Sequence, residues 1–182
     1  MERINGGKKM SKTIENLKQA FAGEAQARNK YTYYAKIARN EGYHYIAKLF
    51  EETAENELQH AKDEFKFLGE LGDTKKNLRA AMEGEHHEEA EMYPRMAKEA
   101  REEGREDVAK LFDEIAQVEK HHEERFRKLL ELVEKGTVYK RDQPIKWKCS
   151  KCGYIHEGEE PPEKCPSCKH PKEYYEPANL EF

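Results

Sequence analysis

The stretches 57–60 (Glu-Leu-Gln-His) and 119–122 (Glu-Lys-His-His) have residue types and a spacing that suit a metal site. On an α-helix, residues three positions apart lie on one face about a turn apart, so each stretch offers a carboxylate and an imidazole to one point. Glu24 precedes the first stretch by 33 residues and Glu85 precedes the second by 34. One glutamate from each of two helices, with Glu-x-x-His from each of two others, is the ligand set of di-iron four-helix bundles.

The candidate ligands share helical stripes with apolar residues such as Phe21 and Phe50, where the core must lie. Several unpaired charges in a core would cost many kcal/mol, so a cation must accompany them. His121, by contrast, shares its face with Glu114 and Arg125, and we expect it to be exposed. Carboxylates and imidazoles without thiolates favour iron or manganese over a soft metal. The predicted di-iron ligands are Glu24, Glu57, His60, Glu85, Glu88, Glu119 and His122.

All four cysteines lie in two Cys-x-x-Cys hooks, at Cys149 and Cys152 and at Cys165 and Cys168. Paired hooks of this kind bring four thiolates into a tetrahedron, and we see no export signal that would favour disulfides. Geometry alone does not choose between zinc and iron, and an isolated module of this kind is most often a structural zinc ribbon. Iron in the neighbouring bundle would need an electron supplier, which favours a mononuclear iron here.

Apolar residues recurring at helical spacing predict four helices, and Gly42 is a candidate C-cap for the first. The helices are expected at about 13–40, 46–67, 75–103 and 105–135. The two halves of this region are a duplication. Gly23-Glu24 matches Gly84-Glu85 at an offset of 61 residues, whereas 47–50 matches 109–112 at an offset of 62.

One residue has therefore been added in the third helix, between Glu85 and Met96. An extra residue inside a helix is absorbed most simply by a π-bulge, and such bulges cluster at functional sites. The third helix is where the two halves of the site should differ.

The chain has 182 residues, of which 36% are hydrophobic and 38% charged, a composition that suits a helical bundle with a thin apolar seam. The formal net charge of −4, with both signs interspersed, argues against a nucleic-acid partner. With no apolar stretch of about 18 residues and no secretion signal, we expect a cytoplasmic protein. The expected divisions are a disordered leader at 1–10, the bundle at 11–136, a linker at 137–145 and a metal-bound β domain at 146–182, which is too short for a core of its own.

The chain resembles the rubrerythrin family over nearly all of its length after Met10. The resemblance rests on Phe21-Ala22-Gly23-Glu24-Ala25, Glu57-x-x-His60, Gly84-Glu85-x-x-Glu88 with Met92-Tyr93-Pro94, Glu119-x-x-His122-x-x-Arg125-Phe126, and both cysteine hooks. It implies a ferritin-like di-iron four-helix bundle with a C-terminal rubredoxin-like domain. It further implies reduction of hydrogen peroxide to water in oxidative-stress defence, with electrons from NAD(P)H through a reductase or a separate rubredoxin.

The same resemblance assigns roles to particular residues. It makes Glu88 and His60 the residues between which one iron shifts with oxidation state. It makes Tyr31 and Tyr93 the tyrosines of the site, each about two turns from Glu24 or Glu85 and near enough for a phenol to reach a metal-bound oxygen. From position alone, both tyrosines are equally compatible with ordinary core packing.

The connection at 69–74 bears on assembly. A ferritin-like third helix starts at the far end of the second, ~40 Å away, whereas six or seven residues reach only ~23 Å. We therefore expect a domain-swapped homodimer, in which two helices of one chain complete the bundle with two of another. The rival arrangement is an up-down-up-down bundle within one monomer.

Two other functions fit the same residues. One is a ferritin-like ferroxidase that oxidises and sequesters iron, with the small domain as a docking module. The other is a non-enzymatic electron carrier or zinc-ribbon interaction protein, with about one metal per chain.

Overall fold

The structure is a computed structural model that describes residues 11–179. The leader predicted at 1–10 lies outside these residues. The chain divides between Gly72 and Asp73 into two compact units. No helix within 11–179 is long and apolar enough to cross a membrane.

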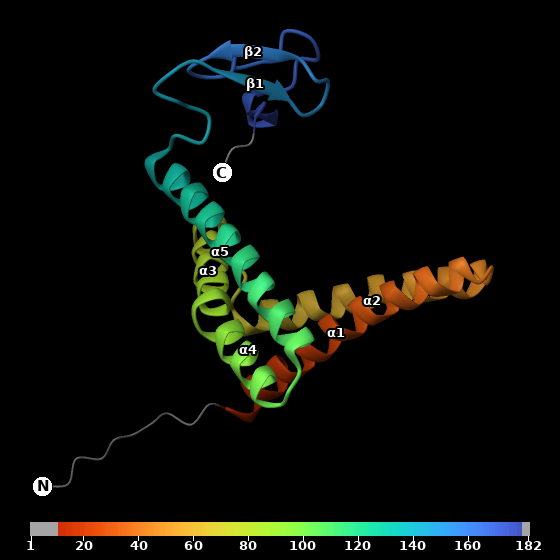
Figure 1. Cartoon of the computed structure of the whole chain (residues 1–182). Coiled ribbons are helices and arrows are strands. Elements are labelled where there is room, and N and C mark those ends of the chain that lie inside the picture. The colour runs from red at the N-terminus through yellow and green to blue at the C-terminus, as the bar shows by residue number, and fades with distance from the viewer. Residues whose placement is uncertain (1–10, 180–182) are drawn as a thin grey trace, which may run out of the picture. The chain divides into compact units, whose positions relative to one another are not determined.

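The first unit is a hairpin of α1 (Lys12–Asn40) and α2 (His44–Leu68), which lie side by side (Figure 1). The side chain of Ser11 accepts a hydrogen bond from the Ile14 N–H and caps the start of α1. Gly42 follows the end of α1 with a φ of +87°, a conformation that glycine adopts without strain. Small side chains let the two backbones approach closely, and the buried residues of the hairpin are all alanines: Ala35, Ala38, Ala47, Ala54 and Ala61.

The second unit begins with a long helix that changes its winding in the middle. The Asp73 carboxylate accepts a hydrogen bond from the Lys76 N–H at 2.8 Å and starts the helix. The N–H of Tyr93 donates to the Glu88 carbonyl, five residues back, so the predicted π-bulge is confirmed at the place of the added residue. The elements of this unit are α3 (Thr74–His87), the π-helix η1 (Glu88–Met92), α4 (Tyr93–Glu102) and α5 (Glu106–Lys135).

Helix α5 packs along α3, η1 and α4 (Figure 1). The seam again uses mostly small residues: Ala97, Ala100, Ala109, Ala116 and Leu130. Glu123 is also buried on α5, and among the described residues it is the single buried charge. Arg127, one turn later on the same helix, pairs with the Glu123 carboxylate and compensates the charge.

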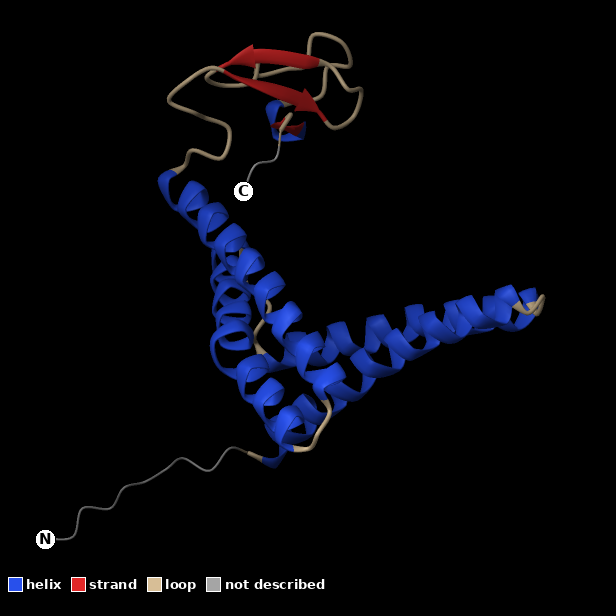
Figure 2. Ribbon diagram, in the orientation of Figure 1, coloured by secondary structure: helices blue, strands red, loops and turns tan. Residues whose placement is uncertain are grey.

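A small antiparallel sheet follows the helices, with strand order β2-β1-β3 (Figure 2). Its strands are β1 (Ile145–Cys149), β2 (Ile155–Gly158) and β3 (Tyr175–Pro177), and the short 3-10 helix η2 (Lys172–Tyr174) precedes β3. In the strand register, Trp147 on β1 is paired with His156 on β2 and with Pro177 on β3. The core consists of Trp147, Cys149, Cys165 and Tyr175. Two of these four residues are cysteines, so the core and the metal-ligand cluster are one structure.

The segment between α5 and β1 folds onto the small sheet. Gly136 ends α5 with a φ of +68°. The Arg141 N–H donates to the Glu159 carbonyl at 2.9 Å, and its guanidinium lies 5.3 Å from the centre of the Trp147 ring. The linker boundaries proposed for 137–145 stay a prediction.

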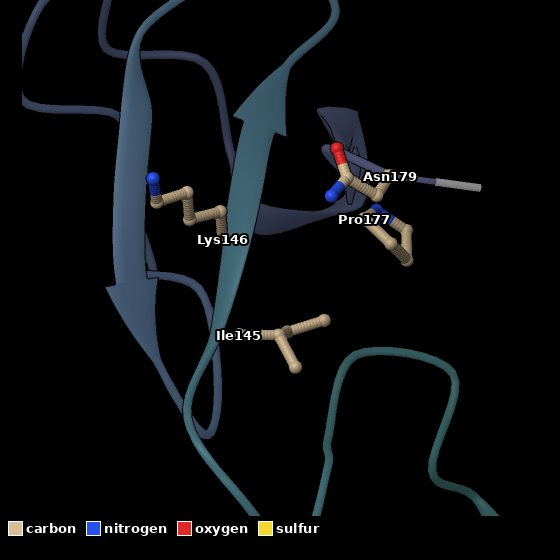
Figure 3. A pocket seen from close by; sticks show the side chains of 4 residues that line it. All are labelled: Ile145, Lys146, Pro177 and Asn179. Atoms are coloured by element: carbon tan, nitrogen blue, oxygen red, sulfur yellow. The ribbon is translucent and has the colours of Figure 1, made fainter. Parts of the chain in front are cut away.

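Figure 3 shows a pocket of about 330 Å³ at the start of β1, lined by Ile145, Lys146, Pro177 and Asn179. Cys149 lies at the other end of β1, about 13 Å along the strand. The pocket is therefore remote from the cysteine cluster.

Candidate metal centres

The α1–α2 hairpin brings together three of the predicted ligands, Glu24, Glu57 and His60. One ligand atom from each lies within 4.8 Å of the others. The i, i+3 spacing on α2 sets the Glu57 Oε2 to His60 Nδ1 distance at 2.8 Å. This is a three-ligand half-site built within one hairpin.

The second unit builds a matching half-site from Glu85 on α3 and from Glu119 and His122 on α5. Their ligand atoms also lie within 4.8 Å of one another. His122 Nδ1 is 2.7 Å from Glu119 Oε2 and 3.9 Å from Glu85 Oε2. The duplication read from the sequence therefore extends to the geometry of the ligands.

In each half-site two carboxylates lie close together, and their mutual repulsion favours binding of a proton or a cation. A hydrogen bond with Glu57, then burial and the Glu57 charge, raise the pKa of Glu24. Burial, then a hydrogen bond with Glu119 and its charge, raise the pKa of Glu85. Carboxylates this close need a proton or a cation between them, and their oxygen and imidazole donors suit iron.

Each half-site lies on a partly exposed face. The Glu57 and Glu119 side chains are only 16% and 14% exposed, whereas the His60 ring is 58% exposed and the His122 ring 36%. Each face offers three ligand side chains.

Glu88, the seventh predicted ligand, lies outside both three-residue clusters. It begins η1, and its charge raises the pKa of Glu85 and that of Tyr93, so its carboxylate lies beside the second half-site. Its role as a ligand stays a prediction. His121 is exposed, as its face of α5 predicted.

The two predicted site tyrosines occupy corresponding positions in the two halves when the added residue of the π-bulge is taken into account. Tyr31 and Tyr93 are 62 residues apart, so the added residue in η1 restores their match. Tyr31 stacks on Phe50 at 6.1 Å, and Tyr93 packs on Phe112 at 5.9 Å. Burial, followed by the charges of nearby glutamates, raises the pKa of Tyr93, so its phenol stays protonated.

Sequence reasoning missed Glu64. Its Oε2 atom is buried without a hydrogen-bond partner among the described residues, and its charge raises the pKa of Glu24. Glu64 follows His60 by four residues and Glu57 by seven, so the same helical periodicity that selected the ligands could have found it.

The four cysteines form one compact cluster, in which all four Sγ atoms lie within 4.8 Å of one another. The Sγ atoms of Cys149 and Cys168 are 3.7 Å apart, and those of Cys152 and Cys165 are 3.6 Å apart. Four sulfurs each about 2.3 Å from a central ion would be separated by about 3.8 Å. All four thiols are free. The cluster fits one ion.

The cluster favours a thiolate at Cys165 and a thiol at Cys168. A backbone hydrogen bond from His170 lowers the pKa of Cys168, but burial and the three neighbouring sulfurs raise it to about 12. Burial alone would raise the pKa of Cys165, but the backbone N–H groups of Cys168 and Ser167 turn toward its sulfur and lower the pKa to about 6. Cys149 and Cys165 are buried, whereas Cys152 is exposed and Cys168 is half-buried. One edge of the site therefore reaches the surface.

Comparison with known proteins accounts for both centres in one chain. A family model described as rubrerythrin matches residues 15–130, and one described as the rubredoxin-like domain of rubrerythrin matches residues 147–176. The chain belongs to the rubrerythrin family. Rubrerythrin-1 of Clostridium acetobutylicum is 50% identical, with 92% of this chain and 95% of that protein covered. The rubrerythrin of Nitratidesulfovibrio vulgaris is 46% identical, with 92% and 95% covered. A solved structure of nigerythrin in a partially reduced state is 34% identical, with 96% and 90% covered and a TM-score of 0.36.

Membership in the rubrerythrin family confirms the fold class and the cofactors. The fold is mainly α and ferritin-like, with a small C-terminal rubredoxin-like β domain. The Glu and His clusters fit a di-iron site, and the four-cysteine cluster fits one further iron.

Proposed function

We propose that the protein is a non-haem di-iron peroxidase that reduces hydrogen peroxide to water in oxidative-stress defence. The observation that carries the proposal is the repeated three-ligand half-site, present once in each helical unit. Reducing one peroxide to two waters takes two electrons and two protons, and two irons, when bound, supply the two electrons. The four-cysteine site in the same chain provides a place where single electrons enter.

The chain's own side chains hold and orient the site. Six ligands come from the two clusters, and Glu88 is proposed as the seventh. His60 and Glu88 are proposed as alternative ligands that exchange with oxidation state. The exposed His60 ring and the position of Glu88 in a π-helix leave both side chains room to move. We propose that the protonated Tyr93 phenol donates a hydrogen bond to a peroxide oxygen, and that Tyr31 does the same in the other half.

The proposed assembly is a domain-swapped homodimer. Helix α2 has 25 residues, a rise of about 38 Å, whereas only residues 69–73 separate it from α3, a reach of about 20 Å. A ferritin-like bundle therefore takes α1 and α2 from one chain and α3 to α5 from its partner.

A complementation experiment tests the swap. One variant carries E57A and H60A and the other carries E119A and H122A, so each chain has one damaged half-site. In a swapped heterodimer, one bundle receives both damaged halves and the other receives both intact halves. Random pairing then restores about a quarter of wild-type activity. If every chain closes its own bundle, the mixture stays inactive.

Electron delivery and location complete the proposal. Electrons from an NAD(P)H-linked donor, a reductase or a separate rubredoxin, enter through the four-cysteine site. The proposed location is the cytoplasm, where free thiols such as these four persist.

Stopped-flow reoxidation tests the function. The fully reduced protein is mixed with hydrogen peroxide or, separately, with oxygen, and the iron-thiolate absorbance is followed. The proposal predicts rapid reoxidation by peroxide and much slower reoxidation by oxygen. Faster reaction with oxygen, together with an accumulating iron core, would support a ferroxidase instead.

A further inference from the structure

The proposed function brings electrons in through the four-cysteine site, and the exposed edge of that site is the surface where a donor can contact it. Cys152 is exposed and Cys168 half-buried, whereas Cys149 and Cys165 are buried. Electrons reach a buried metal most readily where its ligands approach the surface. A donor therefore has to contact this edge.

The two segments that carry the hooks are rich in lysine. Residues 149–155 and 164–172 contain four lysines and no aspartate or glutamate. One of these four lysines, Lys172, pairs with Glu163 at 2.7 Å. Within residues 11–179, no ion pair involves Lys151 or Lys169. Lys151, inside the first hook, and Lys169, directly after the second, are therefore exposed cations without a carboxylate partner.

Lys169 occupies a position that glycine would take more easily. Its φ is +63°, and among the described residues no other non-glycine residue has a positive φ. Its Nζ donates to the Pro166 carbonyl at 2.8 Å, which holds the charge over the second hook. A lysine kept in a strained conformation on the surface suggests a use for its charge.

Aromatic rings join the two hooks into one patch. The Lys151 Nζ lies 5.0 Å from the centre of the Tyr174 ring, which is itself partly exposed. The His170 ring lies edge-on to Tyr174 at 5.0 Å, and its Nδ1 is 3.3 Å from the Cys168 Sγ. An apolar centre with a charged rim over a small area is typical of transient electron-transfer contacts.

We propose that this patch, formed by Lys151, Cys152, Cys168, Lys169, His170 and Tyr174, docks the electron donor, and that the donor is a small one-electron carrier with an acidic surface around its own metal. The inference rests on the proposed function, because it takes the four-cysteine site as the point of electron entry. In each encounter the donor loses one electron and the oxidised four-cysteine iron gains it. Two such encounters supply the two electrons that reduce one molecule of hydrogen peroxide. Opposite charges speed such encounters and orient them.

Binding is tested without turnover on the full chain, with zinc in the four-cysteine site and an oxidised rubredoxin of net negative charge as the probe. The test variant is K151E/K169E. The matched control, K36E/K146E, changes the net charge by the same amount at exposed lysines away from the hooks. We expect the test variant to bind at least about tenfold more weakly in low salt, and the control to stay within about twofold. Equal effects of both variants, or wild-type affinity of the test variant, would overturn the proposal.

Lys169→Gly separates charge from structure. Glycine relieves the positive φ, so the thermal midpoint should hold or rise while the affinity for the rubredoxin falls. Unchanged affinity would contradict a role for the Lys169 charge.

Reoxidation of the pre-reduced iron protein by peroxide distinguishes the two proposals. The K151E/K169E variant should react with peroxide as the wild type does, while the acidic donor reduces it more slowly. A variant that loses donor binding and keeps its reactivity with peroxide would show that the two lysines act in docking alone. A wild-type protein that binds the donor but ignores peroxide would refute the peroxidase and leave the docking surface intact.

Discussion

The two helical halves share their ligands and differ in the helix that carries the first glutamate. Helix α1 runs unbroken through Glu24, whereas the corresponding helix of the second half contains η1 just after Glu85. Ala27 in the first half corresponds to Glu88 in the second, at the same offset of 61 residues as Glu24 and Glu85. Duplication thus provides two similar half-sites, and one added residue with one added carboxylate makes them unequal. A site with unequal halves can change its ligands at one metal and keep them at the other.

The largest expected effect comes from removing the paired ligands of either half. Glu57→Ala with His60→Ala, or Glu119→Ala with His122→Ala, should lower the iron content from three to about one per chain and reduce peroxidase activity by at least about 100-fold. Elemental analysis and NAD(P)H-coupled turnover measure both. The iron-thiolate spectrum serves as the control, since the four cysteines are untouched. Full iron loading in either variant would show that the two halves do not build one site.

The next effect tests the asymmetry itself. Glu88→Ala makes the second half like the first, with its alanine at residue 27. We expect two irons to remain in the bundle and kcat to fall about tenfold or more, because a proposed exchangeable ligand is missing. His121→Ala, at an exposed site beside His122, is the control and should leave kcat unchanged. A wild-type kcat in the Glu88→Ala variant would show that the difference between the two half-sites has no role in turnover.

Stability provides a smaller contrast between the halves. Glu123 is buried on α5, and its counterpart on α2 is Ala61. Arg127→Ala leaves the Glu123 carboxylate without its partner and should lower the free energy of unfolding by about 1 to 3 kcal/mol. Glu123→Ala removes the charge altogether and should cost less. Urea unfolding measures the free energy of unfolding of both variants, and a larger loss for Glu123→Ala would contradict the expected cost of leaving the buried carboxylate unpaired.

The smallest effect concerns how the second helix of each half begins. Helix α5 has Glu106 and Asp107 in its first turn, whereas α2 has no acidic residue there. Hydrogen bonds from Arg105 lower the pKa of Asp107 to about 2, below the usual value of 3.8. A lowered carboxyl pKa stabilises the fold above pH 3.8, and the stabilisation disappears as the pH falls toward 2.

Asp107→Asn should therefore lower the thermal midpoint slightly at pH 5 and have almost no effect near pH 2. A difference between the variant and the wild type that stays constant from pH 5 to pH 2 would exclude this cause.

Local periodicity predicted the parts of the site that local geometry determines. The Glu-x-x-His pairs follow from the helical repeat alone, and the shift in offset from 61 to 62 predicted the π-bulge that the structure has at η1. Features that depend on packing between helices were missed. Glu123 looks like an ordinary acidic residue on a charged helix, yet its side chain is buried in the folded protein. Likewise, no pattern in the sequence predicts the left-handed backbone conformation of Lys169, which directly follows the second Cys-x-x-Cys hook.

The central claim, that the two half-sites together hold two irons apart from the thiolate iron, is tested most directly by Mössbauer spectroscopy. Protein loaded with ⁵⁷Fe and fully oxidised should give two signals in an area ratio of about two to one, a coupled pair with oxygen and nitrogen ligands and one high-spin iron with sulfur ligands. A spectrum containing the sulfur-ligated iron alone would contradict the account.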